Sequence, residues 1–522
     1  MRPSPGAKTA AVALLSSASL LGTLTTAVPA VAASGFTSTY ETISGYGGTP
    51  IKALVFQPEG KGPFPLLVMP SSWSLFHAEY AGAAARLARD SGYVVVSYTS
   101  RGFWDSEGRI EIAGKPDVND MSKVIDWAVT HTRSDAKRIG AAGISYGAGI
   151  SLLGAAFDPR IRAVAAMSAW ADLPDSLFVN ETVSEQTAAA LLLLGHVTGR
   201  PGPDYLTVQD GYIKDDFGTA VKLAEARGAS RYVDRLNASG PAVLIANGWQ
   251  DGMFPPGQIT DFFNRLRTPK RLMFQPGDHG TADGAGAVGL PNDVWAAATR
   301  WFDHHLRGKP SDGKGDVVLK ANSGGPWRSF PAWTAQSGRT LKYTLSGGGT
   351  LTRKKTGWKR TIATGVPTVA DSGVIEGTGA AAQAGIHWTI RPSQVSRKDG
   401  LVFRGPKLGR TTTIGGFPRL RTTVTPSARN TSFFVYLYDE APGGKARLVT
   451  HIPYTLRDVR PGVAKRLDLR LQPIRWTLAR GHRLTLVVDT MDVRYRSTSR
   501  KGGTLTFSAT AAEPSSVTLP TS

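Results

Sequence analysis

The sequence contains no cysteine, and that absence excludes several kinds of chemistry. A chain without cysteine has no disulfide, no thiolate nucleophile, no cysteine-ligated zinc and no iron–sulfur cluster. Beyond its amino terminus, the sequence also lacks any run approaching the roughly 20 apolar residues that a membrane-spanning helix needs. We therefore expect a mature protein with no membrane span, whose domains are stabilised by their hydrophobic cores alone.

Acidic residues are scarce in one half of the chain. The segment from Gly313 to Ser522 has 33 lysines and arginines but only 11 acidic residues, whereas the segment from Met1 to Asp312 has 28 basic and 29 acidic residues. The net charge of +21 therefore belongs to the second half. This asymmetry, in a chain of 522 residues that is too long for one core, predicts at least two modules. A basic module raises the question of an anionic partner.

The amino terminus has the layout of a secretory signal peptide. Arg2 and Lys8 precede a stretch rich in Ala, Leu, Ser and Thr over residues 9–28, and Ala30-Val31-Ala32 offers a small-residue cleavage site. The serines and threonines make the stretch too polar for a stable membrane anchor. No pair of arginines precedes it. Residues 1–32 are therefore predicted to be a signal peptide, and the protein is predicted to be secreted.

The next part of the chain alternates strand and helix patterns. This alternation predicts an α/β domain over residues 33–312, with a parallel sheet covered by helices on both faces. A mostly helical stretch at about residues 173–239 interrupts the alternation, and we interpret it as a cap over the strand ends. The predicted strands cover residues 50–56, 64–69, 92–97, 138–143, 161–167, 242–246 and 271–274, and the main helices cover 80–90, 118–131, 147–157, 258–267 and 292–307.

One short motif points to nucleophilic catalysis. Gly143-Ile144-Ser145-Tyr146-Gly147 follows a predicted strand and opens a predicted helix rich in Ala, Gly and Leu. A serine between small residues at such a strand–turn–helix junction is typical of a nucleophile elbow. Ser145 is therefore the predicted nucleophile.

A serine hydroxyl needs a base, and the base needs an orienting acid. In this architecture the acid and then the histidine follow the serine along the chain. Asp251 lies in the loop after the strand at 242–246, and His279 lies after the strand at 271–274, so these two complete the predicted triad. Asp172, which follows the strand after the elbow, is the reserve acid, and Asp278 is interpreted as a loop carboxylate. Such a mechanism needs no cofactor.

Acyl transfer also needs hydrogen-bond donors for the oxyanion. The backbone N–H of Tyr146, the residue after the nucleophile, is the first predicted donor. The second is expected from the loop Met69–Ser74, where Ser71 and Ser72 are the candidates.

These motifs resemble those of the X-prolyl dipeptidyl-peptidase and cocaine-esterase-like serine hydrolases, and the similarity covers most of the chain. The resemblance implies an α/β-hydrolase domain with a helical cap, followed by an all-β jelly-roll (galactose-binding-like) domain, and it places the family's triad on Ser145, Asp251 and His279. Besides the elbow, the similar stretches are Gly248-Trp249-Gln250-Asp251, Gly277-Asp278-His279, residues 100–108, residues 170–173, residues 301–308, Leu401-Val402-Phe403, residues 434–439 and residues 481–484.

The sequence departs from the family pattern in the oxyanion loop and before the histidine. Ser71 follows Pro70 where the family often has a tyrosine, and Pro276 leads into Gly277-Asp278-His279 where the family often has Pro-Trp-x-His. The long amino-terminal domain of some X-prolyl dipeptidyl-peptidases has no counterpart before the predicted hydrolase. A dipeptidase also needs an anionic pocket for the substrate's amine. The candidates in the predicted cap are Asp204, Asp210, Asp215 and Asp216, although solvated surface carboxylates would look the same.

Past a linker at residues 308–315, short alternating strands replace the helices and predict a basic β-sandwich or jelly roll over residues 313–522. Its basic residues cluster around Trp358 and recur singly along strands. No nucleic-acid-binding motif appears and export argues against that partner, so an anionic cell-wall or surface polymer fits better. A simpler explanation of the positive charge is that the arginines are solvated on the outer faces of the strands.

We therefore expect a secreted serine hydrolase that cleaves an ester or amide bond through an acyl-enzyme. The altered oxyanion loop and the missing amino-terminal domain favour an acyl esterase acting on a small ester. An X-prolyl dipeptidyl-peptidase acting on Xaa-Pro peptides is the first alternative. A wall- or polyanion-binding protein with an inactive hydrolase domain is the second.

Overall fold

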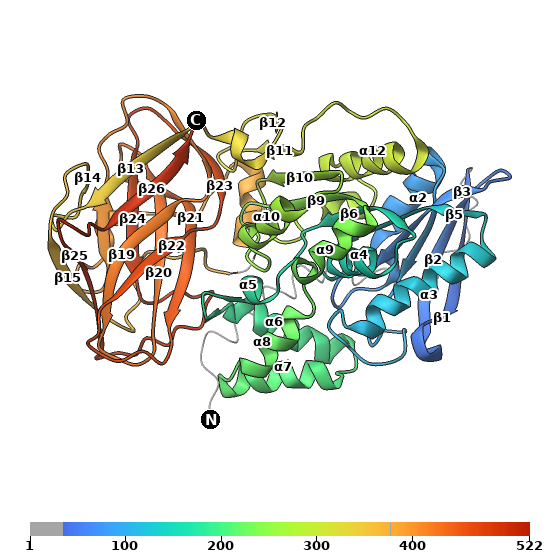
Figure 1. The fold of residues 1–522 in the computed structure, drawn as a ribbon, viewed down its shortest axis with the longest axis horizontal. Coiled ribbons are helices and arrows are strands. Elements are labelled where there is room, and N and C mark those ends of the chain that lie inside the picture. The colour runs from blue at the N-terminus through green and yellow to red at the C-terminus, as the bar shows by residue number, and fades with distance from the viewer. Residues whose placement is uncertain (1–34, 376) are drawn as a thin grey trace.

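A computed structural model describes residues 35–375 and 377–522. The predicted signal peptide lies outside the described residues, so it stays a prediction. Among the residues that the structure describes, no helix has the length and apolar composition needed to cross a membrane. Two domains lie side by side along the long axis, the hydrolase domain at one end and the β domain at the other (Figure 1).

A ten-stranded sheet forms the centre of the hydrolase domain. Its middle strands are parallel from β4 through β3, β5, β6, β9 and β10 to β11, and antiparallel strands close both edges. In sheet order the strands are β1 (Phe36–Ser44), β2 (Pro50–Pro58), β4 (Val94–Tyr98), β3 (Phe64–Pro70), β5 (Ser134–Ile144), β6 (Ile161–Met167), β9 (Ala242–Gly248), β10 (Lys270–Gln275), β11 (Val317–Lys320) and β12 (Trp327–Phe330).

Helices cover both faces of this sheet because its strands are apolar on both sides. Along β3, Leu66 and Val68 pack into one hydrophobic cluster, while Leu67 and Met69 pack into another on the opposite face. Such continuous apolar runs are typical of buried parallel strands. One face is covered by α2 (Ala81–Ser91) and α12 (Asp293–Arg307), and the other by α3 (Lys115–His131), α4 (Tyr146–Phe157) and α10 (Pro256–Arg265).

The predicted α/β-hydrolase architecture is confirmed, and its sheet extends further along the chain than the predicted boundary at Asp312. β11 pairs parallel with β10, Leu272 lying opposite Val317, and β12 pairs with β11. Residues 313–330 therefore complete the hydrolase sheet before the chain enters the β domain. The polar, glycine-containing stretch marks a turn of the chain after α12, and not the end of the sheet.

The helical insertion lies against the edge where the parallel strands end (Figure 1). It leaves the sheet after β6 and returns to it through α9 (Val233–Ser239), which packs on α4. Its elements are α5 (Pro174–Leu177), β7 (Phe178–Val179), β8 (Thr182–Val183), α6 (Glu185–Thr198), α7 (Pro203–Lys214) and α8 (Gly218–Glu225).

The β domain consists of two antiparallel sheets, as the sequence predicted. A nine-stranded sheet contains β13 (Arg339–Leu345), β14 (Leu351–Thr352), β15 (Trp358–Ala363), β18 (Thr412–Gly416), β19 (Arg419–Pro426), β22 (Lys465–Arg470), β23 (Ile474–Leu478), β25 (Thr504–Ala509) and β26 (Ser516–Thr521). A five-stranded sheet contains β16 (Thr389–Ile390), β17 (Leu401–Arg404), β20 (Thr431–Glu440), β21 (Ala446–Leu456) and β24 (Arg483–Asp489).

The β domain also contacts the cap. Thr182 and Thr455 share a hydrogen bond of 2.7 Å between their hydroxyls, and the Arg496 guanidinium donates to Glu185 at 2.7 Å. The second domain therefore supports the insertion that covers the strand ends.

Candidate active site

Ser145 occupies a sharp turn between β5 and α4. Its backbone has φ 54° and ψ −117°, a conformation that is strained for any residue with a side chain. The neighbouring glycines make the turn sterically feasible: a Cβ on Gly143 would lie 2.4 Å from the carbonyl carbon of Gly147, and a Cβ on Gly147 would lie 2.0 Å from the Pro70 oxygen. The sequence motif thus folds into the geometry of a nucleophile elbow.

The structure brings Ser145, His279 and Asp251 together. His279 Nε2 lies 2.8 Å from Ser145 Oγ, and His279 Nδ1 lies 3.0 Å from Asp251 Oδ2. The three residues come from loops after three different strands, 134 and 28 positions apart in sequence from His279. This is the arrangement in which a histidine can accept the serine proton while a carboxylate holds its other nitrogen.

Local contacts hold Asp251 in place. The backbone N–H groups of Met253 and Phe254 donate to Asp251 Oδ1 at 3.1 and 2.7 Å. The Phe254 ring lies edge-on to the His279 imidazole, with 4.9 Å between the ring centres. The acid and the base are therefore fixed by one loop.

Electrostatics favour the protonated form of His279. Burial would lower the pKa of the imidazole, but the adjacent Asp251 carboxylate, with Asp283 and Asp278, outweighs that effect and raises the pKa above the ordinary value of histidine. A raised pKa suits a group that must hold a proton during acyl transfer.

Asp172, the reserve acid, lies elsewhere. Its Oδ1 accepts the backbone N–H of Asp175 at 3.0 Å at the start of α5, and His279 is paired with Asp251. Asp172 therefore has the contacts of a helix-capping residue.

Asp278 has a larger role than that of the loop carboxylate that the sequence predicts. Its side chain is completely buried and accepts four backbone N–H groups. Oδ1 accepts those of Gly252 and His279 at 3.0 and 2.8 Å, and Oδ2 accepts those of Gly377 and Gly379 at 3.1 and 2.9 Å. The N–H groups of Gly252 and His279 belong to the hydrolase domain, and those of Gly377 and Gly379 belong to the β domain. The Asp278 carboxylate therefore connects the turn that carries His279 to both domains.

The predicted oxyanion donors differ in their surroundings. Tyr146 begins α4, where the first N–H groups have no acceptor within the helix. The Ser71 N–H donates to the Tyr98 carbonyl at 2.9 Å, and its side chain is fully buried. Ser72 donates its N–H and its hydroxyl to the Glu79 carboxylate, at 2.7 and 2.6 Å. The contacts of both serines are thus with the scaffold, and of the three only Tyr146 keeps an N–H for an oxyanion.

A cavity of about 160 Å³ lies between Ser145 and the cap, and we call it the cap cavity. Apart from the Ser145 hydroxyl, its lining is almost entirely apolar and aromatic, and within the described part of the chain no charged side chain lines it. The hydrolase domain contributes Trp73, Ile112, Ser145, Tyr146, Trp170 and Phe254, and the cap and its flanks contribute Leu173, Pro174, Leu177, Phe178, Val183, Ala188, Leu191, Leu192, Tyr205, Val208, Tyr212, Phe217, Ala220, Val221, Leu223 and Ala224.

The four cap carboxylates considered for an amine pocket are engaged outside the cap cavity. Asp204 pairs with Arg227, and Asp210 pairs with Lys214. Asp215 pairs with Arg457 of the β domain at 3.2 Å, and Asp216 accepts the Gly218 N–H. The structure therefore does not bring them to Ser145.

Two family models match the chain. The model described as X-Pro dipeptidyl-peptidase (S15 family) covers residues 47–281, which include Ser145, Asp251 and His279. The model described as X-Pro dipeptidyl-peptidase C-terminal non-catalytic domain covers residues 311–518. The chain belongs to the S15 family of serine hydrolases. The resemblance drawn from the sequence motifs is confirmed.

Known proteins similar to this S15 hydrolase support the fold. An aminopeptidase from the marine sediment archaeon Thaumarchaeota archaeon superposes with a TM-score of 0.73 at 16% identity, covering 96% of this chain and 98% of that one. An α-amino acid ester hydrolase gives a TM-score of 0.73 at 16% identity, covering 96% and 99%. An Escherichia coli protein called an uncharacterized 31.7 kDa protein in the traX-finO intergenic region is 24% identical over 283 residues, which are 49% of this chain and 96% of its own length.

Sequence reasoning on this S15 hydrolase missed the role of Asp278. Its partners come from residues 252, 279, 377 and 379, so the motif around His279 alone contained no signal for it. The glycine at position 379 is a partial signal in the sequence. A Cβ on Gly379 would lie 2.6 Å from the Gln250 side chain and 2.9 Å from Asp278 Oδ2. Glycine allows the close approach there.

Proposed function

We propose that this S15 hydrolase is an esterase that cleaves esters with a small apolar group through an acyl-enzyme. Ser145 Oγ attacks the ester carbonyl while His279 Nε2 takes its proton, and Asp251 holds the imidazolium that forms. The Tyr146 N–H donates to the oxyanion. His279 then gives the proton to the departing alkoxide, and a water molecule, deprotonated by His279, releases the acid from Ser145.

The apolar lining of the cap cavity is the observation that supports an ester substrate. A dipeptidyl-peptidase must bind the charged terminal amine of the residue that precedes the proline at the scissile bond, and burying an unpaired ammonium group is costly. No charged side chain among the described residues lines the cap cavity, and the cap carboxylates have other partners. An uncharged acyl or alkyl group, by contrast, gains about 0.8 kcal/mol for each CH2 it buries there.

An X-prolyl dipeptidyl-peptidase is the second candidate. The description of the matching family model and the aminopeptidase among the similar structures favour it. A proline ring is itself apolar and would suit the cap cavity, so the amine is the feature that separates the two candidates.

A side-by-side assay of the purified protein tests the proposal. We expect hydrolysis of nitrophenyl esters, with kcat/KM rising up to about fourfold per added CH2 until the cap cavity is filled, and little turnover of Xaa-Pro anilides. The Ser145→Ala variant should lose essentially all ester turnover. Anilide turnover without ester turnover would establish the second candidate, and undiminished turnover by Ser145→Ala would exclude both.

A further inference from the structure

A second large cavity opens on the β domain, far from Ser145. It has a volume of about 620 Å³, and we call it the arginine groove. The segments 347–352 and 400–406 line it, together with Arg360, Arg397 and Arg483. β14 and β15, which contribute to its walls, lie at the edge of the β domain farthest from the hydrolase domain (Figure 1).

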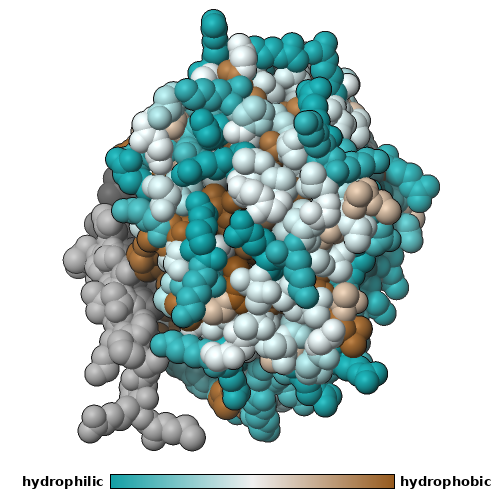
Figure 2. Space-filling view, turned by 90° about the vertical axis from the view of Figure 1, so that its left-hand side faces the viewer, coloured by the Kyte–Doolittle hydropathy of each residue, from teal (hydrophilic) through white to brown (hydrophobic). Residues whose placement is uncertain are grey.

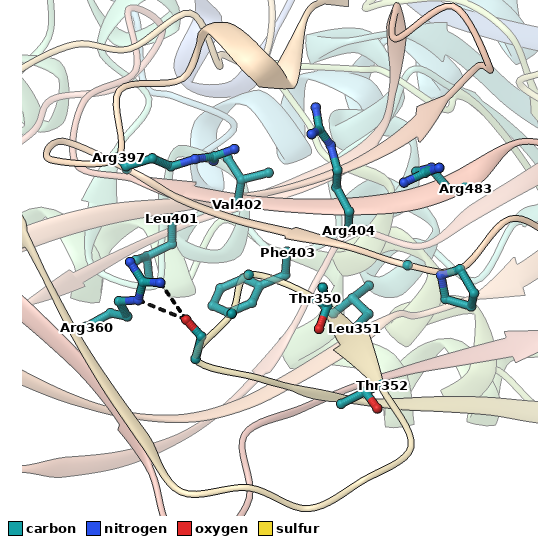
Figure 3. Close-up of a pocket in the computed structure, with 16 residues that line it drawn as sticks. Thr350, Leu351, Thr352, Arg360, Arg397, Leu401, Val402, Phe403, Arg404 and Arg483 are labelled. Atoms are coloured by element: carbon teal, nitrogen blue, oxygen red, sulfur yellow. Dashed lines mark hydrogen bonds between the residues drawn. The ribbon is translucent and has the colours of Figure 1, made fainter.

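Four arginines face the arginine groove from two sides. Arg397, Arg404 and Arg483 lie along one wall, and Arg360 lies on the opposite wall with Thr350 and Thr352 (Figure 3). No acidic residue is among the described residues that line it. The size of the cavity and its convergent charged groups of one sign are features of a ligand site.

Two of the four guanidinium groups have no hydrogen-bond or ion-pair partner among the described residues. Arg404 Nε donates to Glu440 at 3.1 Å, and Arg360 donates twice to the Gly347 carbonyl. Within residues 35–375 and 377–522, the guanidinium groups of Arg397 and Arg483 have neither a hydrogen bond nor an ion pair. Burial lowers the pKa of Arg397, and the charges of Arg404 and Arg360 lower it further, so these like charges are held close together. An anion placed between them would relieve that repulsion.

The surroundings of the arginine groove strengthen the positive field. Arg353, Lys354 and Lys355 lie in the short segment that leads from β14 to β15, and Lys359 lies in β15 itself. Several acidic residues of the β domain are buried and so contribute little at the surface, namely Asp439, Glu440, Asp489 and Asp492. On this end of the molecule, hydrophilic side chains alternate with residues of intermediate hydropathy and with a few hydrophobic ones (Figure 2).

We propose that the arginine groove binds an anionic polysaccharide, and that its arginines form ion pairs with carboxylate or phosphate groups along the polysaccharide. The planar guanidinium matches both oxyanions in a bidentate geometry. Single-stranded nucleic acids instead rely on exposed aromatic rings for base stacking. The aromatic residue that lines the arginine groove cannot stack in that way, because Phe403 is only 2% exposed.

Binding of the full chain to soluble polysaccharides tests the proposal. The probes are polygalacturonate, which carries carboxylates, phosphorylated dextran, which carries phosphates, and unmodified dextran as the neutral control. The test variant is Arg397→Gln with Arg483→Gln. The matched control is Arg429→Gln with Arg460→Gln, which removes the same charge from the β domain outside the arginine groove.

We expect the wild-type chain to bind at least one of the two anionic probes and not unmodified dextran. The test variant should weaken that binding at least tenfold and the control variant less than about twofold, with ester hydrolysis unchanged in both. The anionic probe that binds identifies the oxyanion. Equal losses in the two variants, binding of unmodified dextran, absence of binding to both anionic probes, or tighter binding of an oligothymidylate would each overturn the proposal.

Discussion

The hydrolase domain and the β domain place their polar groups in opposite ways. In the hydrolase domain, Ser145, Asp251 and His279 converge in the interior, where their contacts are short and directional. In the β domain, acidic residues such as Asp439 and Asp489 are buried, while most of the arginines stay near the surface, Arg475 and Arg494 being buried exceptions. The first arrangement suits bond-making chemistry, because fixed groups in a dry site interact strongly. The second arrangement suits recognition of an anionic partner through the positive electrostatic potential of the surface.

The largest expected effect tests whether the chemistry depends on the interior of the hydrolase domain. Asp251→Asn should lower kcat about 10⁴-fold, because the imidazolium loses its carboxylate and His279 its orienting acceptor. Asp172→Asn, the matched change at the other candidate acid, should leave kcat within about twofold. Steady-state kinetics on a nitrophenyl ester measures both. A comparable loss in Asp172→Asn would contradict the assignment of the acid.

The same variant has a signature in the pH profile. His279 must be neutral to accept the serine proton, so kcat/KM should fall as pH drops through its raised pKa. Removing the Asp251 carboxylate takes away a charge that raises this pKa, so the acidic limb should move to lower pH in Asp251→Asn. A limb that does not move would mean that another group controls it.

The next largest effect is expected at Asp278, which accepts hydrogen bonds from both domains. Asp278→Asn replaces an oxygen that accepts two N–H groups with an amide nitrogen that faces them. Hydrogen bonds to a charged group contribute about 1.5–3 kcal/mol, so the melting temperature should fall by several degrees. Because the His279 N–H is one of the donors, kcat should also fall about tenfold, which makes Asp278 a positioning residue.

The control for Asp278→Asn is Asp399→Asn. Asp399 accepts one hydrogen bond, from the Ser396 hydroxyl at 2.6 Å, and its partner lies within the β domain. The Asp399→Asn variant should change the melting temperature only slightly and leave kcat unchanged. Asp278→Asn could lower the melting temperature and yet leave kcat unchanged when kcat is measured well below that temperature. Asp278 would then stabilise the contact between the domains without positioning His279.

The two domains also differ in what their sequences could predict. In the hydrolase domain, long helices and continuous apolar strands gave the element order, and the triad followed from residues at strand ends. β1 was missed because it is an exposed edge strand, and β11 because it lies past the linker. In the β domain, β15 was interpreted as a basic cluster, since Lys359 and Arg360 lie in it beside the buried Trp358. Contacts between distant segments, such as those of Asp278, required the folded chain.

The smallest expected effect concerns an ion pair on the surface between the domains. Asp261 in α10 pairs with Arg470 in β22, and their side chains are 39% and 41% exposed. Exposed pairs contribute about 0–1 kcal/mol and weaken with salt, so Asp261→Asn should shift the melting temperature by less than about 2 °C. Changing Asp261 is cleaner than changing Arg470, because the Arg470 guanidinium also lies 4.2 Å from the centre of the Phe417 ring. If Asp261→Asn destabilised the protein as much as Asp278→Asn, the exposed pair would stabilise the domain contact as strongly as the buried carboxylate, and the expected ranking of the two would be wrong.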